Sequence, residues 1–339
     1  MKRTRVLHWG LGAMGAGAAR MVLGKQGLEL AGAVCRTPSK LGKDIGDILG
    51  VGKTGAQVSS SLAEALGRGP ADIVIHATGS FTREVYGQLV EAVHAGLDVI
   101  TIAEEMAYPW VGEPELARSL DELAKAKGVT VLGTGVNPGF VLDTLVITLT
   151  GACIRVDSIR AARVNDLSPF GPTVMRTQGV GTTLEEFQAG VAAGNIVGHV
   201  GFPESMTMIA KAIGWELDEI KQEKQPIVSK VYRETPHVKV QPGMVAGCNH
   251  TAWGYMDGRV VITLEHPQQI HPGLAGVETG DYIWITGEPN INVANKPEVP
   301  GGIGTIATSV NMIPLVRAAA PGLLTMADLP LPRATMGRS

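Results

Sequence analysis

Cysteine, charge and aromatic side chains are all scarce in this sequence of 339 residues. Its three cysteines, Cys35, Cys153 and Cys248, are widely separated and form no C-x-x-C pair, which excludes a disulfide framework and a zinc ribbon. We therefore expect buried thiols in a reducing cytoplasm. Only 18% of the residues are charged, against about 25% in a typical soluble protein, while 45% are hydrophobic. Apolar side chains in this proportion must pack into a core, which excludes intrinsic disorder.

The chain also lacks a charge bias and a long apolar run. Its 29 basic and 32 acidic residues leave a net charge of −3, too little to hold a nucleic-acid backbone. The longest uncharged stretch, residues 299–316, contains two prolines and three glycines and is a poor membrane span. Basic residues near the N-terminus resemble the start of a secretory signal, but the glycine spacing that follows indicates another role. We expect neither a nucleic-acid nor a membrane partner.

Glycine, by contrast, is abundant, with 44 residues or about 13% of the chain against the usual ~7%. Three glycines form a G-x-G-x-x-G motif between an apolar run, Val6–Trp9, and a helical pattern over Ala13–Leu23. In a strand–turn–helix these glycines permit a tight turn, the approach of a pyrophosphate and close helix packing. The alternative is a glycine turn that binds no nucleotide. The motif predicts a dinucleotide site formed by Gly10, Leu11, Gly12, Ala13, Met14 and Gly15.

Strands and helices alternate through the first 136 residues. After the first strand and helix, we predict strands at residues 28–34, 71–77, 98–103 and 129–132, and helices at residues 82–95 and 113–127. This alternation is typical of βαβ units, so we expect an α/β fold with a doubly wound parallel sheet.

The pattern changes after Gly135. We predict strands at residues 154–164 and 227–240, helices at 141–149, 182–193, 203–213 and 302–319, and a hairpin over 244–265 that turns at Asp257-Gly258. The second domain is therefore α+β, with an open mixed or antiparallel sheet. We divide the chain into a nucleotide-binding domain, residues 1–136, a substrate and dimerisation domain, residues 137–299, and a returning helix and tail packed on the first domain, residues 300–339.

The residues after the second predicted strand bear on the choice of cofactor. An NAD enzyme usually has an acidic residue about 20 positions beyond the glycine motif, where it binds the ribose 2′-hydroxyl. Here Arg36 and Thr37 occupy that place, with Lys40 close by. A guanidinium and a hydroxyl suit a 2′-phosphate, so we expect NADP, and NAD as a further cofactor stays open. Alternatively, Arg36 is a solvated surface residue.

Two further strands are followed by polar residues at the carboxyl edge of the sheet, where ligands bind in open α/β folds. Thr78, Gly79 and Ser80 follow one strand and are expected to contact the nicotinamide ribose, or else to form a simple turn. Glu104 and Glu105 follow the next strand. Crowding or partial burial would raise the pKa of one of these carboxyls and suit it to proton transfer. The alternative is a pair of acids in the first turn of a helix.

Other candidate residues lie farther along the chain. The loop Gly133–Phe140 is rich in glycine, asparagine and proline, and either offers backbone groups to a ligand or acts as a hinge. Arg163, Asn165 and Asp166 end a strand of the second domain and are candidates for binding a substrate carboxylate and amine, although surface charge is equally consistent. The histidines show no metal-ligand spacing, so we expect no metal.

Five segments carry a family resemblance: WGLGAMG at residues 9–15, HATGSF at 76–81, ITIAEEMAYPW at 100–110, GTGVNPGFVLDTL at 133–145 and EHPQQIHP at 265–272. Over nearly the whole chain, the sequence resembles 2,4-diaminopentanoate dehydrogenase and the related native amine dehydrogenases. The wider family resembles dihydrodipicolinate reductase and homoserine dehydrogenase, in which a Rossmann domain leads into an α+β substrate domain and the chain returns through a late helix.

The resemblance implies reversible oxidative deamination of the 4-amino group of 2,4-diaminopentanoate, or of a related amine, to 2-amino-4-oxopentanoate, with NAD(P)+ accepting the hydride. Glu104 matches the glutamate with which the related amine dehydrogenases hold ammonia and transfer a proton. In reverse, the enzyme would aminate a ketone with ammonia. We also expect a homodimer formed through the second-domain sheet. The resemblance further implies Asn311 turned toward the cofactor and a substrate pocket formed by Asn137, Phe140, Thr144, Arg163 and Asn165.

Two other functions stay open at this point. An alcohol oxidoreductase of the homoserine dehydrogenase type would carry a lysine where Glu104 stands, which counts against that function. A non-catalytic NADP sensor would have no use for acids beside its cofactor motif. Ammonia-dependent turnover separates the amine dehydrogenase from both alternatives.

Overall fold

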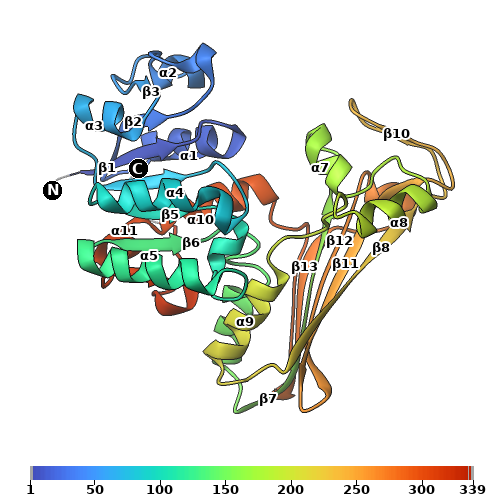
Figure 1. The fold of residues 1–339 in the computed structure, drawn as a ribbon. Coiled ribbons are helices and arrows are strands. Elements are labelled where there is room, and N and C mark those ends of the chain that lie inside the picture. Colours follow the sequence, from blue (N-terminus) through green and yellow to red (C-terminus); the bar gives the residue numbers. More distant parts are fainter. Residues whose placement is uncertain (1–2, 335, 337–339) are drawn as a thin grey trace. The chain divides into compact units, whose positions relative to one another are not determined.

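The computed structural model describes residues 3–334 and 336, and the chain divides into two compact units (Figure 1). Unit 1 comprises residues 1–140 and 300–339, and unit 2 comprises residues 141–299. Residues 137–140, which we assign from the sequence to the second domain, fall in unit 1. Their loop folds back on itself, because a Cβ at Gly139 would lie only 2.4 Å from the backbone nitrogen of Gly135. None of the helices described here is long and apolar enough to cross a membrane.

Unit 1 is built on a seven-stranded sheet in the order β15-β6-β5-β4-β1-β2-β3, and every neighbouring pair is parallel. This confirms the predicted α/β fold. The central strands β4, β5 and β6 are buried at every position, as expected when helices cover both faces. The strands are β1 (Thr4–Trp9), β2 (Leu28–Val34), β3 (Val58–Ser59), β4 (Ile73–His76), β5 (Asp98–Thr101), β6 (Thr130–Gly133) and β15 (Gly322–Leu324).

Helices cover both faces of this sheet, with α4 next to α5 and α10 next to α1 (Figure 1). The helices are α1 (Ala13–Leu23), α2 (Ile45–Leu49), α3 (Leu62–Arg68), α4 (Thr82–His94), α5 (Pro114–Lys127), α10 (Gly301–Asn311) and α11 (Ile313–Ala318). Short 3-10 turns are η1 (Pro38–Lys40), η2 (Glu104–Ala107) and η4 (Met326–Asp328). The helices after β1, β4 and β5 match their predicted positions to within one residue, because their apolar spacing and glycine stops are unambiguous.

The single helix predicted over residues 302–319 is wrong, because two helices occupy this stretch. α10 ends at Asn311 and α11 begins at Ile313. Pro314 lies in the first turn of α11. Its ring removes the N–H that would continue the hydrogen bonds of α10 and would clash with the preceding turn, so the chain starts a new helix.

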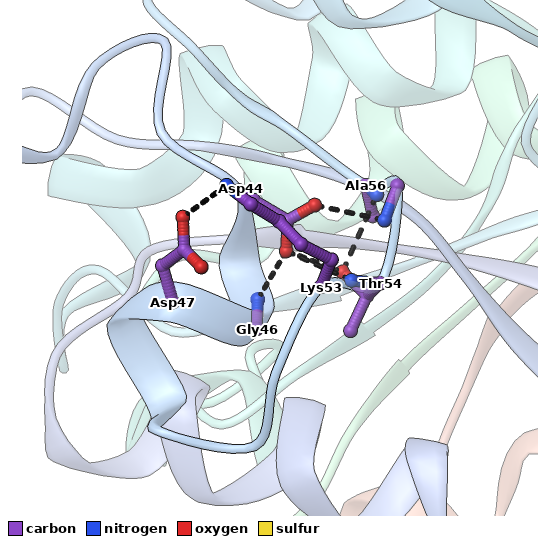
Figure 2. Close-up of polar contacts among 7 residues, drawn as sticks. Asp44, Gly46, Asp47, Lys53, Thr54 and Ala56 are labelled. Atoms are coloured by element: carbon purple, nitrogen blue, oxygen red, sulfur yellow. Dashed lines mark hydrogen bonds and ion pairs between the residues drawn. The ribbon is translucent and has the colours of Figure 1, made fainter.

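The glycine-rich segment 42–55 is organised around Asp44 (Figure 2). The Asp44 carboxylate accepts hydrogen bonds from the N–H groups of Gly46, Thr54 and Gly55 and from the Thr54 hydroxyl, at 2.7–3.0 Å. Burial alone would raise the pKa of Asp44, but these hydrogen bonds lower it to about 2. A Cβ at Gly46 would lie 1.7 Å from the Gly52 carbonyl oxygen. The glycines of this segment therefore allow the loop to fold compactly.

Unit 2 contains a six-stranded sheet in the order β14-β13-β7-β12-β11-β8, in which β12 and β7 are parallel and the other pairs antiparallel. The sheet is therefore mixed. Its strands are β7 (Arg155–Asp166), β8 (Glu219–Val228), β11 (Val245–Met256), β12 (Arg259–Gln269), β13 (Gly280–Glu288) and β14 (Ile291–Asn295), with a separate ribbon of β9 (Arg233–Glu234) and β10 (Lys239–Val240). The helices are α6 (Thr144–Thr150), α7 (Pro172–Thr177), α8 (Leu184–Ala192), α9 (Phe202–Ala212) and the 3-10 turn η3 (Pro272–Ala275).

The hairpin predicted over residues 244–265 is confirmed by β11 and β12. Asp257 and Gly258, the two residues between these strands, have φ values of 51° and 70°. Two successive positive φ values match the right-handed twist of the flanking strands, which is why Asp-Gly is a strong hairpin signal.

The strand predicted over residues 227–240 is wrong over most of its length. β8 ends at Val228, and only the two-residue strands β9 and β10 follow. Pro236 separates these short strands and has no N–H to offer a ladder. The main part of β8 was not predicted, because this edge strand is dominated by charged and polar residues that hide its apolar period. Nor were α7, β13 and β14 predicted.

One face of the unit 2 sheet is buried and the other is partly exposed. On β11, His250, Ala252 and Gly254 are buried, whereas Thr251 and Trp253 between them are only half-buried. α9 packs on β12 and α8 on β8, and Figure 1 shows α7, α8 and α9 on the same side of the sheet. This alternation is typical of a sheet with one core face.

Candidate active site

The glycine motif forms a tight turn between β1 and α1. Gly10 has a φ of +97°, and a Cβ there would lie 2.3 Å from the Ala77 carbonyl oxygen. A Cβ at Gly15 would lie 2.0 Å from the Gly10 carbonyl oxygen. Gly12, at the N-terminus of α1, is exposed and has open space where its Cβ would be. The loop thus leaves room for a pyrophosphate at a helix N-terminus, which fits a dinucleotide.

The segment after β2 presents Arg36 and Thr37 to solvent. Lys40, at the end of η1, donates a hydrogen bond from Nζ to the Leu11 carbonyl oxygen at 2.6 Å. This bond ties the segment to the glycine motif. The segment that carries Arg36 is therefore anchored to the loop that would hold the pyrophosphate.

The two adjacent glutamates lie in η2, directly after β5, and they have different partners. Glu105 accepts the Thr82 N–H at 2.7 Å through Oε2 and so caps the start of α4. Glu105 therefore matches the alternative of an acid that stabilises a helix N-terminus, although that helix is α4 rather than its own. Glu104 is half-buried, and burial raises the pKa of its carboxyl, although a hydrogen bond from the Ser80 side chain opposes the shift. A raised pKa suits a group that both takes and gives a proton near neutrality.

Polar atoms without partners gather after β6 and at the end of α10. Both side-chain amide atoms of Asn137 are buried without a hydrogen-bond partner in the part of the chain that the structure describes, and so are Thr134 Oγ1 and Asn311 Oδ1. Thr305 of α10 accepts the Val136 N–H at 3.2 Å and so joins this helix to the loop. Buried polar atoms are nearly always paired in native proteins, so these atoms indicate a place for a polar ligand.

The predicted role of Arg163 requires a free cation that can bind a substrate carboxylate. In the structure its guanidinium is already paired. Its side chain is only 2% exposed, and Nη1 lies 2.5 Å from Asp281 Oδ1 on β13. Nη2 donates to the Val299 carbonyl oxygen. Burial raises the pKa of Asp281, although the charge of Arg163 opposes the shift. The guanidinium is thus largely committed inside unit 2, because a buried charge is stable only when paired.

Three histidines form a cluster beside Arg163 that the sequence patterns did not predict, with His250 and His266 buried and His199 half-buried. His250 and His266 face each other in register on β11 and β12. The rings of His199 and His266 have centroids 4.8 Å apart, and His250 Nδ1 accepts the His199 N–H at 2.9 Å. Alternation along β11 and β12 signals that His250 and His266 point inward, but nothing in the sequence brings His199 to them.

These histidines are neutral and carry unused hydrogen-bonding atoms. Burial lowers the pKa of His199 to about 3 and that of His250 to about 4, and it lowers the pKa of His266 well below its ordinary value. Within residues 3–334 and 336, both ring nitrogens of His266, Nε2 of His199 and Oδ1 of Asn165 are buried without a partner. The described residues include no group of three or more potential ligands that could hold a metal. The cluster can instead donate to and accept from a polar organic group.

The remaining predicted pocket residues lie where the two units join in sequence. Phe140 is half-buried at the end of unit 1. Thr144 is buried at the first position of α6, with Asp143 accepting its N–H at 2.5 Å. This capping bond explains why α6 begins at residue 144 and not at residue 141, as predicted.

Two family models match the chain. The model of the 2,4-diaminopentanoate dehydrogenase C-terminal domain matches residues 140–339, and that of the dihydrodipicolinate reductase N-terminus matches residues 4–100. The chain is 51% identical to the 2,4-diaminopentanoate dehydrogenase of Acetoanaerobium sticklandii, over 99% of this chain and 96% of the relative. It is 26% identical to the amine dehydrogenase of Streptomyces virginiae, over 97% of each chain.

A solved structure shows the same likeness in three dimensions. The amine dehydrogenase from Mycobacterium smegmatis superposes with a TM-score of 0.86 at 31% identity, over 98% of this chain and 97% of that chain. The likeness therefore covers both units.

Proposed function

Because the chain belongs to the 2,4-diaminopentanoate dehydrogenase family, we propose that it oxidises the 4-amino group of 2,4-diaminopentanoate to 2-amino-4-oxopentanoate. It is an NAD(P)-dependent oxidoreductase that acts on amines. The overall change converts the substrate ammonium, NAD(P)+ and water into the ketone, ammonium, NAD(P)H and a proton. The observation that carries the choice of substrate is the 51% identity to the Acetoanaerobium sticklandii enzyme over nearly the full length of both chains.

Glu104 is the proposed proton-transfer group. In the oxidative direction its carboxylate takes a proton from the substrate ammonium, and the freed nitrogen lone pair assists the departure of hydride from the adjacent carbon. The nicotinamide of a dinucleotide whose pyrophosphate binds at the glycine motif would accept that hydride. In reverse, Glu104 holds ammonia near the ketone and returns the proton. Its position beside Ser80 at the carboxyl edge of the sheet and its raised pKa support this role.

Recognition of the substrate is proposed for residues with unused polar atoms. In unit 2, Asn165, His199 and His266 offer neutral donors and acceptors suited to an amino acid, and Asn137 of unit 1 stays a predicted pocket residue. Because the charge of Arg163 is already paired, its proposed role is to orient the groups it binds, Asp281 and the Val299 carbonyl. Phe140 and Thr144 stay predicted pocket residues, and a cytoplasmic location stays a prediction from the sequence.

The function is tested by mixing the purified protein with NADPH, ammonia and 2-amino-4-oxopentanoate. We expect loss of NADPH absorbance that depends on ammonia. Loss without ammonia would indicate an alcohol oxidoreductase, and binding of NADPH without turnover would indicate a sensor; either result contradicts the proposal.

NADP is the proposed cofactor, with Thr78, Gly79, Ser80 and Asn311 as further contacts. Arg36→Ala should weaken NADPH binding by roughly 1.5–3 kcal/mol, the value of a hydrogen bond to a charged group, which is about 10- to 150-fold. NADH binding should change little. Fluorescence titration of both nucleotides measures the difference, with Lys43→Ala as a control for loss of nearby positive charge. Equal weakening of both nucleotides would show that Arg36 does not contact the phosphate.

The partly exposed face of the unit 2 sheet is the proposed dimer interface. Tyr282 and Trp284 stack there with centroids 5.6 Å apart. Arg160 lies 4.4 Å from the centre of the Trp284 ring and pairs with Glu265 at 2.7 Å. Aromatic residues next to charges of both signs suit a contact in which the same patch of two copies meets itself.

Trp284→Glu should therefore convert a dimer into a monomer, because it places a new charge at the centre of this patch. Analytical ultracentrifugation would then report half the mass of the wild type. Leu274→Glu, at an exposed position in η3, is the control and should stay dimeric. A monomeric wild type, or a dimeric Trp284→Glu variant, would contradict the assignment of this face.

A further inference from the structure

His76 lies at the centre of a hydrogen-bond network at the carboxyl edge of the unit 1 sheet. It is the last residue of β4 and is only 1% exposed. Its Nδ1 lies 3.0 Å from Thr101 Oγ1 at the end of β5. Its Nε2 lies 2.7 Å from Gln88 Oε1 on α4 and 2.9 Å from Thr78 Oγ1. One imidazole therefore joins the ends of two strands to a helix.

The proton positions in this network follow from its partners. Burial lowers the pKa of His76 to about 4, although the hydrogen bond to Gln88 opposes the shift, so the ring is neutral near pH 7. Thr101 Oγ1 accepts the Ala103 N–H at 3.2 Å, and its own buried proton is satisfied by His76 Nδ1. The ring proton is then on Nε2 and is donated toward Gln88 Oε1. The Thr78 hydroxyl donates to the same oxygen at 2.7 Å.

Both ends of the network lead to groups of the candidate active site. Thr101 holds the N–H of Ala103, the residue directly before Glu104. Thr78 lies two residues before Ser80, whose carbonyl oxygen accepts the Glu105 N–H at 3.2 Å and whose hydroxyl lowers the pKa of the adjacent Glu104 carboxyl. The network therefore restrains the chain on both sides of the contact between Ser80 and Glu104.

His8 provides a contrast within the same sheet. It lies on β1, next to β4, and is fully buried. Burial lowers the pKa of His8 to about 3, and among the described residues neither of its ring nitrogens has a hydrogen-bond partner. A buried histidine can thus be packed in this sheet without partners, whereas His76 has three.

We propose that His76 is a positioning residue, which holds the ends of β4 and β5 at the spacing that lets Ser80 meet Glu104. This inference rests on the proposed role of Glu104. A misplacement of about 1 Å in a catalytic group costs up to about 10²-fold in rate, so a side chain that does not touch the substrate can have a large effect on kcat.

The test compares His76→Leu with His8→Leu, which removes an equally buried histidine from a neighbouring strand. We expect kcat at saturating NADPH to fall at least about tenfold in His76→Leu, because Ser80 and Glu104 lose their alignment. Loss of the Ser80 contact should also move the acidic limb of the kcat/KM profile to higher pH. His8→Leu should keep the wild-type kcat and pH profile. Thermal melting of both variants measures any loss of stability.

A second pair of variants keeps the fold intact. Thr101→Val has nearly the shape of threonine but lacks the hydroxyl, and it should reproduce the His76→Leu effects, whereas Thr101→Ser should restore kcat. The double variant His76→Leu/Thr101→Val should be no slower than the slower single variant, because both break one network.

Two results would overturn the inference. If His76→Leu and Thr101→Val match His8→Leu in kcat and pH profile, His76 only packs, although the proposed function stands. If the wild type shows no ammonia-dependent NADPH oxidation, the proposed function fails, and the positioning role fails with it.

Discussion

Glu104→Gln should lower the turnover of amine and of ketone with ammonia by about 10³-fold or more, while NADPH still binds normally. Proton transfer by a placed side chain contributes about 10²–10⁴-fold, and the positioning of ammonia adds to it. The amide is nearly the same size as the carboxylate but cannot take the proton. Stopped-flow and steady-state NADPH absorbance measure the rate, and fluorescence titration measures binding.

Glu105→Gln is the matched control for this variant. The glutamine keeps an oxygen that can accept the Thr82 N–H, so the cap of α4 survives. It should keep most of the wild-type turnover. Near-normal turnover in Glu104→Gln, or equal losses in both variants, would contradict the assignment of Glu104 as the proton-transfer group.

The same assignment predicts a pH dependence. Deamination needs Glu104 as a carboxylate, so kcat/KM for the amine should fall as the pH drops through the pKa of this group. Because burial raises that pKa, the fall should be centred above 4.5, the ordinary value for glutamate. This fall of kcat/KM at low pH should be absent from the residual activity of Glu104→Gln.

Gly12→Val should weaken NADP(H) binding by at least about 10²-fold and leave the fold intact. Gly12 has an extended backbone, with φ −71° and ψ −168°, which valine adopts readily. Apart from its own chain neighbours, nothing lies within 4 Å of its Cβ position, so the side chain has room to enter and fills the space that the pyrophosphate needs. Isothermal titration calorimetry measures the affinity and circular dichroism the fold.

Gly171→Val is the control for backbone effects. Gly171 precedes α7 with nearly the same backbone, φ −78° and ψ 172°, and its Cβ position is also open. This variant should bind NADPH like the wild type. If Gly12→Val also binds normally, the glycine motif is not the pyrophosphate site.

The nucleotide-binding half of the fold could be predicted from the sequence because its signals are local. The alternation of apolar strands and amphipathic helices specifies the order of elements, and parallel pairing then places the residues after β4, β5 and β6 at one edge. The glycines at positions 10 and 15 are required by contacts with nearby backbone, and their spacing alone reveals that requirement.

The choice between the two glutamates could not be made from residue chemistry alone. Glu104 and Glu105 are adjacent acids after the same strand, and the family resemblance favoured Glu104. Only the structure shows that Glu105 is bonded to the N–H of Thr82, 23 positions earlier in the chain. A side chain of η2 can cap α4 only if the two elements pack together, and neither composition nor periodicity encodes that packing.

The sequence by itself determined the parallel sheet, the glycine loop and the edge at which polar residues collect, because each depends on spacing within a few tens of residues. Tertiary structure alone decided that Arg163 pairs with Asp281, 118 positions away, and that three histidines share one buried cluster. It also gave His76 its partners on β5 and α4. Such pairs depend on strand register and on how distant segments fold against each other. A polar group is costly to leave unpaired only when it is buried, and burial exists only once the chain has folded.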